Sequence, residues 1–206
     1  MMKLINPLND ILDSPVKVKI LRFLVATKAE WNGRQIAKET GVAPATSHKA
    51  LQELYGQGVL ILRNIGKTHV YSLNKESFVV SSLLRPLFAR EREILDKISD
   101  IITARVNYSG LKRSIVSIAV FGSVSRKDVH PASDIDLAVI AKDERSKPKI
   151  EALFQAIDAK VSKEFGNTVS VYLNTESEFK AKQSKGLAVI KNILKDYKLI
   201  YGKDLK

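Results

Sequence analysis

Apolar residues in the first third of the chain recur every three or four positions, which is the period of an amphipathic helix. This spacing predicts three helices, over residues 15–27, 32–40 and 43–57. Residues 60–63 and 69–73 are predicted to be strands instead, because Gly66 in the segment between them indicates a hairpin turn. The first 75 residues are therefore expected to form an α+β domain of three helices and a hairpin.

Residues 76–110 carry a further pattern of three- and four-residue apolar gaps. It predicts a long helix or a pair of helices, with Pro86 as the kink or boundary. The apolar stripe is larger than a simple linker needs, so we expect it to pack the flanking domains together or to pack against a second copy of the chain. The second use would make the protein a homodimer.

The second half of the chain mixes strand and helix patterns. It predicts three strands, over residues 115–121, 135–139 and 168–173, and a short terminal strand or apolar tail at 199–202. It predicts two helices, over residues 149–165 and 187–197. The first helix connects the second strand to the third, so this half is expected to be an α/β domain with a mixed sheet.

Two carboxylates and a glycine turn lie around the second strand of this domain. Asp134 and Asp136 alternate with apolar residues, so their side chains are expected on one face of the strand. Two adjacent carboxylates repel unless a cation neutralises them, and Mg²⁺ prefers such oxygen ligands together with phosphates. The backbone N–H groups of a turn at Gly122 and Ser123 can bind phosphate oxygens. The stretch therefore indicates metal-assisted phosphoryl chemistry.

An apolar strand, Gly-Ser, ten residues and Asp-x-Asp resembles the nucleotidyltransferase superfamily that includes DNA polymerase β, and its minimal nucleotidyltransferase branch in particular. The resemblance implies Asp134 and Asp136 as catalytic residues that ligate Mg²⁺ or Mn²⁺. It also implies Gly122 and Ser123 at the phosphates of a nucleoside triphosphate. In that family one metal ion activates the attacking oxygen and another stabilises the leaving pyrophosphate. Arg126 is either a donor to the phosphates or a solvated loop residue.

The resemblance has one departure. The family carries a third carboxylate on a later strand, where it completes the metal site and helps to activate the incoming hydroxyl. The matching position here is Ser170, whose hydroxyl cannot supply that charge. Either Glu176 or Glu178 replaces it from a loop, or Asp128 does, or the metal site is incomplete. Loss of this carboxylate weakens general-base function more than nucleotide binding.

The first third of the chain resembles winged helix-turn-helix regulators of the ArsR and MarR type. The residues that carry the resemblance are Gln35-Ile36-Ala37, Gly41-Val42, Ala45-Thr46-Ser47, Leu51, Leu54 and Gly58-Val59-Leu60. In such folds the third helix enters the DNA major groove and the hairpin lies along the backbone. The expected contacts are Thr46, His48 and Gln52 at base edges, Lys49 at phosphate, and Arg63, Lys67 and His69 at phosphates or the minor groove. Regulators of this type usually bind DNA as dimers, so the resemblance also implies a homodimer. A winged helix used for protein contact or dimerisation is the alternative.

The chain has 34 Lys and Arg residues against 22 Asp and Glu residues, and the net charge of +12 is spread over both halves. Such a charge favours nucleic acid or another polyanion, such as a nucleotide or an anionic membrane. The absence of cysteine excludes disulfides and thiolate metal sites. The sequence shows neither a signal peptide nor a spanning apolar run. We expect a cytoplasmic protein without a membrane partner.

The expected organisation is a winged helix-turn-helix DNA-binding domain at residues 1–75, a helical linker at 76–110 and a nucleotidyltransferase-like domain at 111–206. Two functions fit it. In the first, the DNA-binding protein uses a divalent metal to transfer a nucleoside monophosphate from NTP to an unknown acceptor, as the Gly-Ser and Asp-x-Asp motifs indicate. In the second, which Ser170 favours, it is a transcriptional regulator whose inactive domain senses a nucleotide or binds a partner.

Overall fold

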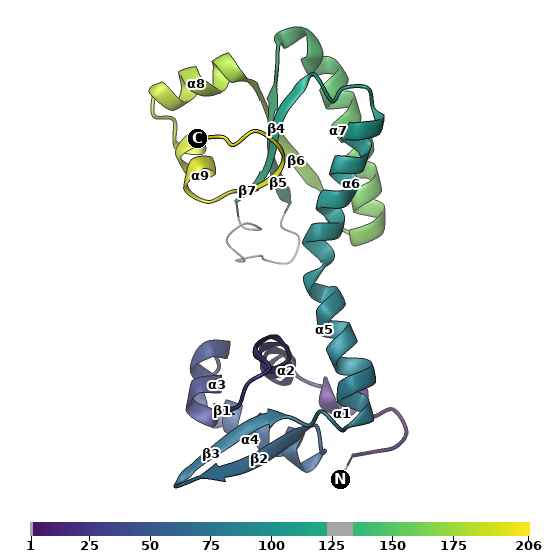
Figure 1. Ribbon diagram of the computed structural model, residues 1–206, viewed down its shortest axis with the longest axis vertical. Helices are drawn as coiled ribbons and strands as arrows, with labels where there is room; N and C mark the ends of the chain where they lie inside the picture. The colour runs from purple at the N-terminus through teal and green to yellow at the C-terminus, as the bar shows by residue number, and fades with distance from the viewer. Residues whose placement is uncertain (1, 123–133) are drawn as a thin grey trace. The chain divides into compact units, whose positions relative to one another are not determined.

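The computed structural model describes residues 2–122 and 134–206, and the chain divides into two compact units, residues 1–93 and 94–206 (Figure 1). The boundary falls inside the segment that was predicted to be a linker. Residues 79–92 pack into the core of the first unit, whereas residues 94–108 pack into the core of the second. Within the described residues, no helix is both long enough and apolar enough to cross a membrane.

The first unit is built on helices that enclose one apolar core. Its helices are α1 (Leu8–Ile11), α2 (Pro15–Thr27), α3 (Gly33–Thr40), α4 (Pro44–Gly56), the π-helical η1 (Val79–Leu84) and α5 (Arg85–Arg92). Polar caps fix two of the helix starts: the Ser14 hydroxyl accepts a hydrogen bond from the backbone N–H of Lys17, and Asn32 and Gln35 form a reciprocal capping box. Buried residues from α2, α3 and α4 form the centre of the core.

A three-stranded antiparallel sheet completes this unit, with strand order β1-β3-β2. The strands are β1 (Trp31–Asn32), β2 (Leu60–Ile65) and β3 (Thr68–Leu73), and the last two form the predicted hairpin with Gly66 in its turn at a φ of 59°. The helices α2, α3 and α4 followed by this hairpin confirm the predicted winged helix-turn-helix fold. The short helix α1 and the two-residue strand β1 were not predicted, because segments of four and two residues carry too little periodicity.

One charged side chain is buried where α1, α2 and α4 meet. Lys17 is 3% exposed, and its ammonium group contacts the carboxylates of Asp13 at 3.1 Å and Glu53 at 2.8 Å. It also donates a hydrogen bond to the backbone carbonyl of Asp10 at 2.7 Å. Burial lowers the pKa of Lys17, but the hydrogen bonds to Glu53 and Asp13 outweigh it, so the pKa is raised above its ordinary value. Lys17 therefore stays charged and ties the three helices together.

The second unit contains a four-stranded mixed sheet with strand order β6-β5-β4-β7. Its strands are β4 (Ile115–Phe121), β5 (Ile135–Ala141), β6 (Val169–Thr175) and β7 (Lys198–Gly202). β4 is antiparallel to both β5 and β7, whereas β5 and β6 are parallel. This arrangement confirms the predicted mixed sheet, and residues 198–202 form a terminal strand rather than a free tail.

Helices cover both faces of this sheet (Figure 1). On one face pack α6 (Ile94–Tyr108) and α7 (Lys147–Phe165), and on the other pack α8 (Glu176–Ser184) and α9 (Ala188–Lys195); a short 3₁₀ turn, η2 (Glu144–Ser146), precedes α7. α7 is the crossover that a parallel β5–β6 pair requires. Ile135, Leu137 and Val139 lie in the core under α6 and α7, whereas Ala138 and Ile140 lie in the core under α8 and α9.

Helix α8 replaces the loop that was expected after the third strand. Thr175 and Glu178 cap its first turn reciprocally, and this Thr-x-x-Glu pattern is a sequence signature of a helix start. The expectation of a loop at Glu176 and Glu178 was therefore wrong, and the capping pattern is the signal that would have corrected it.

Candidate functional site

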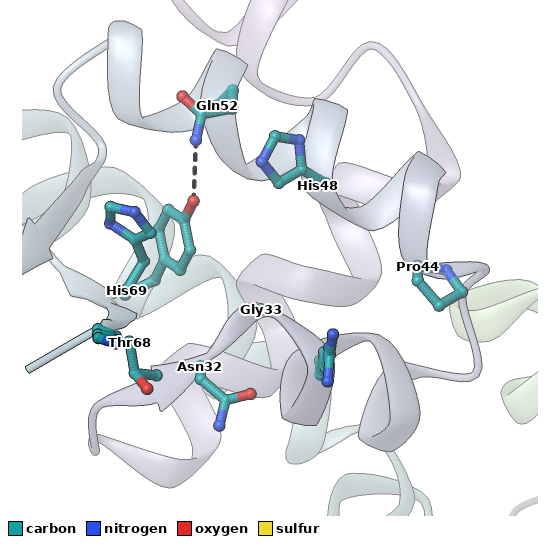
Figure 2. A pocket seen from close by; sticks show the side chains of 10 residues that line it. Asn32, Gly33, Pro44, His48, Gln52, Thr68 and His69 are labelled. Carbon is teal, nitrogen blue, oxygen red and sulfur yellow. Dashed lines mark hydrogen bonds between the residues drawn. The ribbon is translucent and has the colours of Figure 1, made fainter. Parts of the chain in front are cut away.

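A groove of about 670 Å³ lies between the start of α3, the outer face of α4 and the end of the β2–β3 hairpin (Figure 2). Its lining residues are Asn32, Gly33, Arg34, Pro44, His48, Gln52, Lys67, Thr68, His69 and Tyr71. His48 and Gln52 form one wall from α4, and His69 faces them from the hairpin. The lining contains basic and hydrogen-bonding side chains and no Asp or Glu, so its chemistry suits an anion.

The predicted DNA contacts divide into two groups around this groove. His48, Gln52, Lys67 and His69 line it. Thr46 and Lys49 are exposed on α4 but do not line it. The Gln52 side-chain amide donates a hydrogen bond of 2.9 Å to the Tyr71 hydroxyl, so this amide is held across the groove between α4 and the sheet (Figure 2).

Arg63 occupies the other face of the hairpin. It pairs in register with Val70, whereas its neighbour Leu62 pairs with Tyr71, the residue that faces α4. Because neighbouring residues of a strand point to opposite faces, the Arg63 side chain points away from the groove. Its guanidinium bonds to Glu30 at 2.9 Å. The structure therefore separates Arg63 from the residues that line the groove.

Sequence reasoning missed Arg34 as a groove residue. Arg34 is exposed in the first turn of α3, and Asn32, which caps that helix, lines the groove beside it. The capping box of Asn32 and Gln35 was readable from the sequence as a helix start. That this start faces the hairpin depends on tertiary packing, which no local pattern records.

In the second unit, Asp134 and Asp136 stand at the start of β5. Asp134 immediately precedes the strand and is exposed, and Asp136 is partly buried within it. Asp136 alternates with Ile135 and Leu137, so it belongs to the sheet face that carries Ala138 under α8 and α9. Another chain segment approaches its carboxylate closely.

Gly122 makes that close approach at the end of β4. Its φ is 79°, which favours glycine, and Phe121 beside it is the register partner of Asp136. A Cβ atom at position 122 would lie 2.4 Å from the Asp136 Oδ2 atom. The glycine thus leaves space for this carboxylate. Ser123 and Arg126, predicted at the phosphates, and the alternative acid Asp128 lie outside the described residues.

Two hydroxyl side chains, one in β6 and one just before it, flank the two aspartates. Asp136 pairs in register with Ser170, and the Thr168 hydroxyl donates a hydrogen bond to the Asp134 Oδ1 atom. Paired residues of neighbouring strands share a face of the sheet, so Ser170 stands directly beside Asp136. The position where a third carboxylate was expected therefore holds a neutral hydroxyl.

Glu176 and Glu178 cannot replace that carboxylate. They follow Thr175, the residue paired with Ala141 at the far end of β5, which lies five residues or about 17 Å along the strand from Asp136. The hydrogen bond from Lys147, at 2.5 Å, lowers the pKa of Glu178, and Glu178 also accepts a hydrogen bond from the backbone N–H of Thr175. Across residues 2–122 and 134–206, no three His, Cys, Asp or Glu side chains are placed to share a metal ion.

Comparison with known families identifies this unit. The sequence model described as polymerase beta, nucleotidyltransferase, matches residues 106–206. Residues 106–206 are a nucleotidyltransferase domain of the polymerase beta family. The matched region contains the whole motif that carried the resemblance. Gly122 follows strand β4, and Asp134 and Asp136 lie at the start of β5.

Solved structures are similar to parts of the chain. NolR from Sinorhizobium fredii is 26% identical over 37% of this chain and 73% of its own, with a TM-score of 0.33. The homodimeric winged helix-turn-helix DNA-binding domain Mb0332 from Mycobacterium bovis, a possible ArsR-family regulator, is 23% identical over 44% and 76%, with a TM-score of 0.34. A toxin-antitoxin crystallised with AMP-PNP is 19% identical over 52% and 74%, with a TM-score of 0.32. None of the curated proteins matches the sequence significantly.

The nucleotidyltransferase domain has a donor set that fits one divalent cation. Asp134 and Asp136 offer carboxylate oxygens, which Mg²⁺ or Mn²⁺ takes together with phosphates and water. A Cβ at position 122 would crowd the Asp136 carboxylate, and glycine there avoids this. When bound, the cation would neutralise the carboxylates and the triphosphate; the hydroxyl of Ser170 adds no charge to this set.

Proposed function

We propose that this protein is a DNA-binding regulator that holds a nucleoside triphosphate, through a divalent ion, in its nucleotidyltransferase domain. The observation that carries the nucleotide part is the contact between Gly122 and the Asp136 carboxylate at the ends of β4 and β5. This proximity of a glycine to a carboxylate that can bind a metal ion supports a nucleotide site there. The DNA part is supported by the carboxylate-free groove between α3, α4 and the hairpin.

A DNA strand in that groove would present phosphates to Arg34 and Lys67, with the first turns of α4 directed at base edges. Thr46, His48, Lys49 and Gln52 stay proposed contacts on α4 in this arrangement. The first unit has fourteen basic and eight acidic residues, so its overall charge also favours DNA.

The test of DNA binding uses the full chain and fragments of DNA from upstream of its own gene. Combined Arg34→Ala and Lys67→Ala should weaken binding measured by fluorescence anisotropy, and should lower the slope of log Kd against log salt by about 2, one for each lost phosphate contact. Lys19→Ala, an exposed lysine on α2, is the matched control and should leave both quantities unchanged. Binding that ignores salt and both groove substitutions would point to a protein partner.

The test of nucleotide binding is calorimetry with ATP, GTP, CTP and UTP in turn, in Mg²⁺ or Mn²⁺. Asp134→Ala combined with Asp136→Ala should abolish binding, because the remaining hydroxyls cannot neutralise the cation. Asp100→Ala, an exposed acid on α6, is the control and should bind as the wild type does. Binding that persists without either aspartate would refute the assignment of the site.

Transfer of a nucleoside monophosphate to an acceptor hydroxyl is the second candidate function. The preserved placement of Gly122, Asp134 and Asp136 favours it. With radiolabelled NTP and divalent metal, transfer would label an acceptor and release pyrophosphate, and the double aspartate variant would do neither. Nucleotide binding without turnover over a range of acceptors would leave the regulator as the function.

A homodimer and a cytoplasmic location belong to the same proposal. Leu83 and Leu87, four residues apart on η1 and α5, are 38% and 49% exposed and form an apolar surface on the first unit. Sedimentation equilibrium of the wild type should give a dimer mass, and Leu83→Glu with Leu87→Glu should give a monomer. A monomeric wild type at micromolar concentration would remove the dimer from the proposal.

A further inference from the structure

The neighbours of Asp136 decide how many metal ions its site can hold. On β4 its register partner is Phe121, and on β6 it is Ser170. Adjacent strands lie about 4.8 Å apart, so a side chain at either position reaches the Asp136 carboxylate. Phenylalanine has no oxygen, and position 170 is therefore the place in the sheet from which a further anionic ligand would come.

A second hydroxyl lies two residues before Ser170, immediately ahead of β6. The Thr168 hydroxyl donates to the Asp134 Oδ1 atom, and the Thr168 backbone carbonyl accepts a hydrogen bond from the Ile135 N–H at 2.8 Å. Thr168, immediately before β6, and Ser170, within it, thus stand beside the two aspartates. Both are neutral, and the threonine proton engages one of the carboxylate oxygens that a metal would otherwise use.

A single divalent ion and a pair of ions require different sets of ligands. A single Mg²⁺ or Mn²⁺ is satisfied by one or two carboxylates, phosphate oxygens and water. A second ion about 3.5–4 Å away, on the side of the acceptor, has fewer phosphate ligands and relies more on protein carboxylates. With Asp134 and Asp136 shared and a hydroxyl at position 170, strands β4, β5 and β6, as far as the structure describes them, offer such an ion no negative ligand of its own.

We propose that the nucleotidyltransferase domain binds its nucleoside triphosphate with one divalent ion, and that Ser170 excludes the second. This inference rests on the proposed nucleotide site and adds the metal count and the residue that determines it. The bound triphosphate is held without an ion that would activate an acceptor oxygen, which is the state expected of a sensor.

The experiment counts Mn²⁺ on the full-length protein. Free Mn²⁺ is followed by electron paramagnetic resonance during titration in the presence of saturating α,β-methylene analogues of ATP, GTP, CTP and UTP in turn, which cannot transfer a nucleoside monophosphate. Parallel titrations of each analogue without protein correct for the ion that it binds alone. The wild type should bind one ion per chain and Ser170→Asp two, because the new carboxylate stands beside Asp136. Ser170→Asn, similar in shape but uncharged, should bind one.

The number of bound Mn²⁺ ions distinguishes failure of this inference from failure of the proposed nucleotide site. No Mn²⁺ with any analogue would overturn the nucleotide site and the inference together. Two ions in the wild type would overturn the inference alone, whichever residue supplied the extra ligand. One ion in both the wild type and Ser170→Asp would overturn the role of Ser170. If Ser170→Asp does not fold, Ser170→Glu reaches the same place, and the wild-type count alone still distinguishes one ion from two.

Discussion

Replacing Gly122 by alanine tests the geometry on which the nucleotide site depends. The substitution has two effects, since Gly122 has a φ of 79° and a Cβ there would lie 2.4 Å from the Asp136 Oδ2 atom. Gly166, which ends α7 at a φ of 75°, has only the first effect, because no atom lies within 4 Å of where a Cβ would stand. Gly166→Ala in the same unit is therefore a matched control.

The expected magnitudes follow from these two effects. A left-handed conformation costs a residue with a Cβ about 1–2 kcal/mol, and the stiffer unfolded chain returns about 0.4–1 kcal/mol, so Gly166→Ala should lower the free energy of unfolding by about 1 kcal/mol. In Gly122→Ala the Asp136 carboxylate must also rotate away, and an off-rotamer side chain costs about 0.5–1.5 kcal/mol. The total for Gly122→Ala should be about 1.5–2.5 kcal/mol.

Urea unfolding measures these costs, and calorimetric titration with NTP and Mn²⁺ measures the effect on the site. Because the displaced carboxylate is a proposed metal ligand, Gly122→Ala should raise the Kd for nucleotide at least about tenfold, or about 1.4 kcal/mol. Gly166→Ala should leave the Kd unchanged. Wild-type affinity in Gly122→Ala, with the stability loss present, would show that the position of the Asp136 carboxylate does not govern binding, and the reasoning would fail.

Three further predictions concern the first unit. Lys17→Met should lower the free energy of unfolding by about 1–3 kcal/mol at neutral pH. Burial lowers the pKa of Lys17, but its acidic partners raise it further, so its contribution is complete from neutral pH to about pH 10.4 and is lost as pH rises through the folded-state pKa. A stability gap between the two proteins that already closes between pH 7 and pH 9 would contradict this. Glu91→Gln should cost about 0.5–1 kcal/mol, a discounted figure because Arg22 and Glu91 are 41% and 39% exposed. The hydrogen bond from Arg22 lowers the pKa of Glu91, so this stability is present above about pH 4.3 and is lost as pH falls through the lower folded-state pKa. Urea unfolding of the wild type and Glu91→Gln at pH 7 and pH 3 measures this change. An equal difference in unfolding free energy at both pH values would refute the prediction. Tyr71→Phe should cost about 0.5–1.5 kcal/mol in urea unfolding through loss of its bond to Gln52, and no loss would mean that this hydrogen bond is replaced by water.

The fold was largely predictable because its signals are local. Helices α2, α3, α4 and α7 follow apolar periodicity and capping, and the β2–β3 hairpin follows alternation around Gly66. The predicted strands are found as β4, β5 and β6, with boundaries shifted by only a few residues. Helix α8 was missed although its capping pattern is in the sequence, and α1 and β1 are too short to give a period.

The candidate sites were predictable only in part. Sequence alone predicts that Asp134 and Asp136 share a face, because strand alternation is a property of the backbone. The neighbours of that face were not predictable from the sequence, because β5 lies between β4 and β6 through pairings that join residues far apart in the chain. The same holds for Arg34, which joins the groove only because α3 packs beside the hairpin.

The sequence by itself determined two modules, a winged helix-turn-helix and a mixed-sheet domain with Gly122 and the two aspartates, since periodicity, caps and motif spacing depend on residues close together in the chain. Tertiary structure alone decided which side chains meet. In the folded protein Ser170 lies beside Asp136, and Glu176 and Glu178 lie at the opposite end of the sheet. The Arg63 side chain points away from the groove. Strand register and helix packing make those contacts, and both are set by burial of apolar surface across the whole domain.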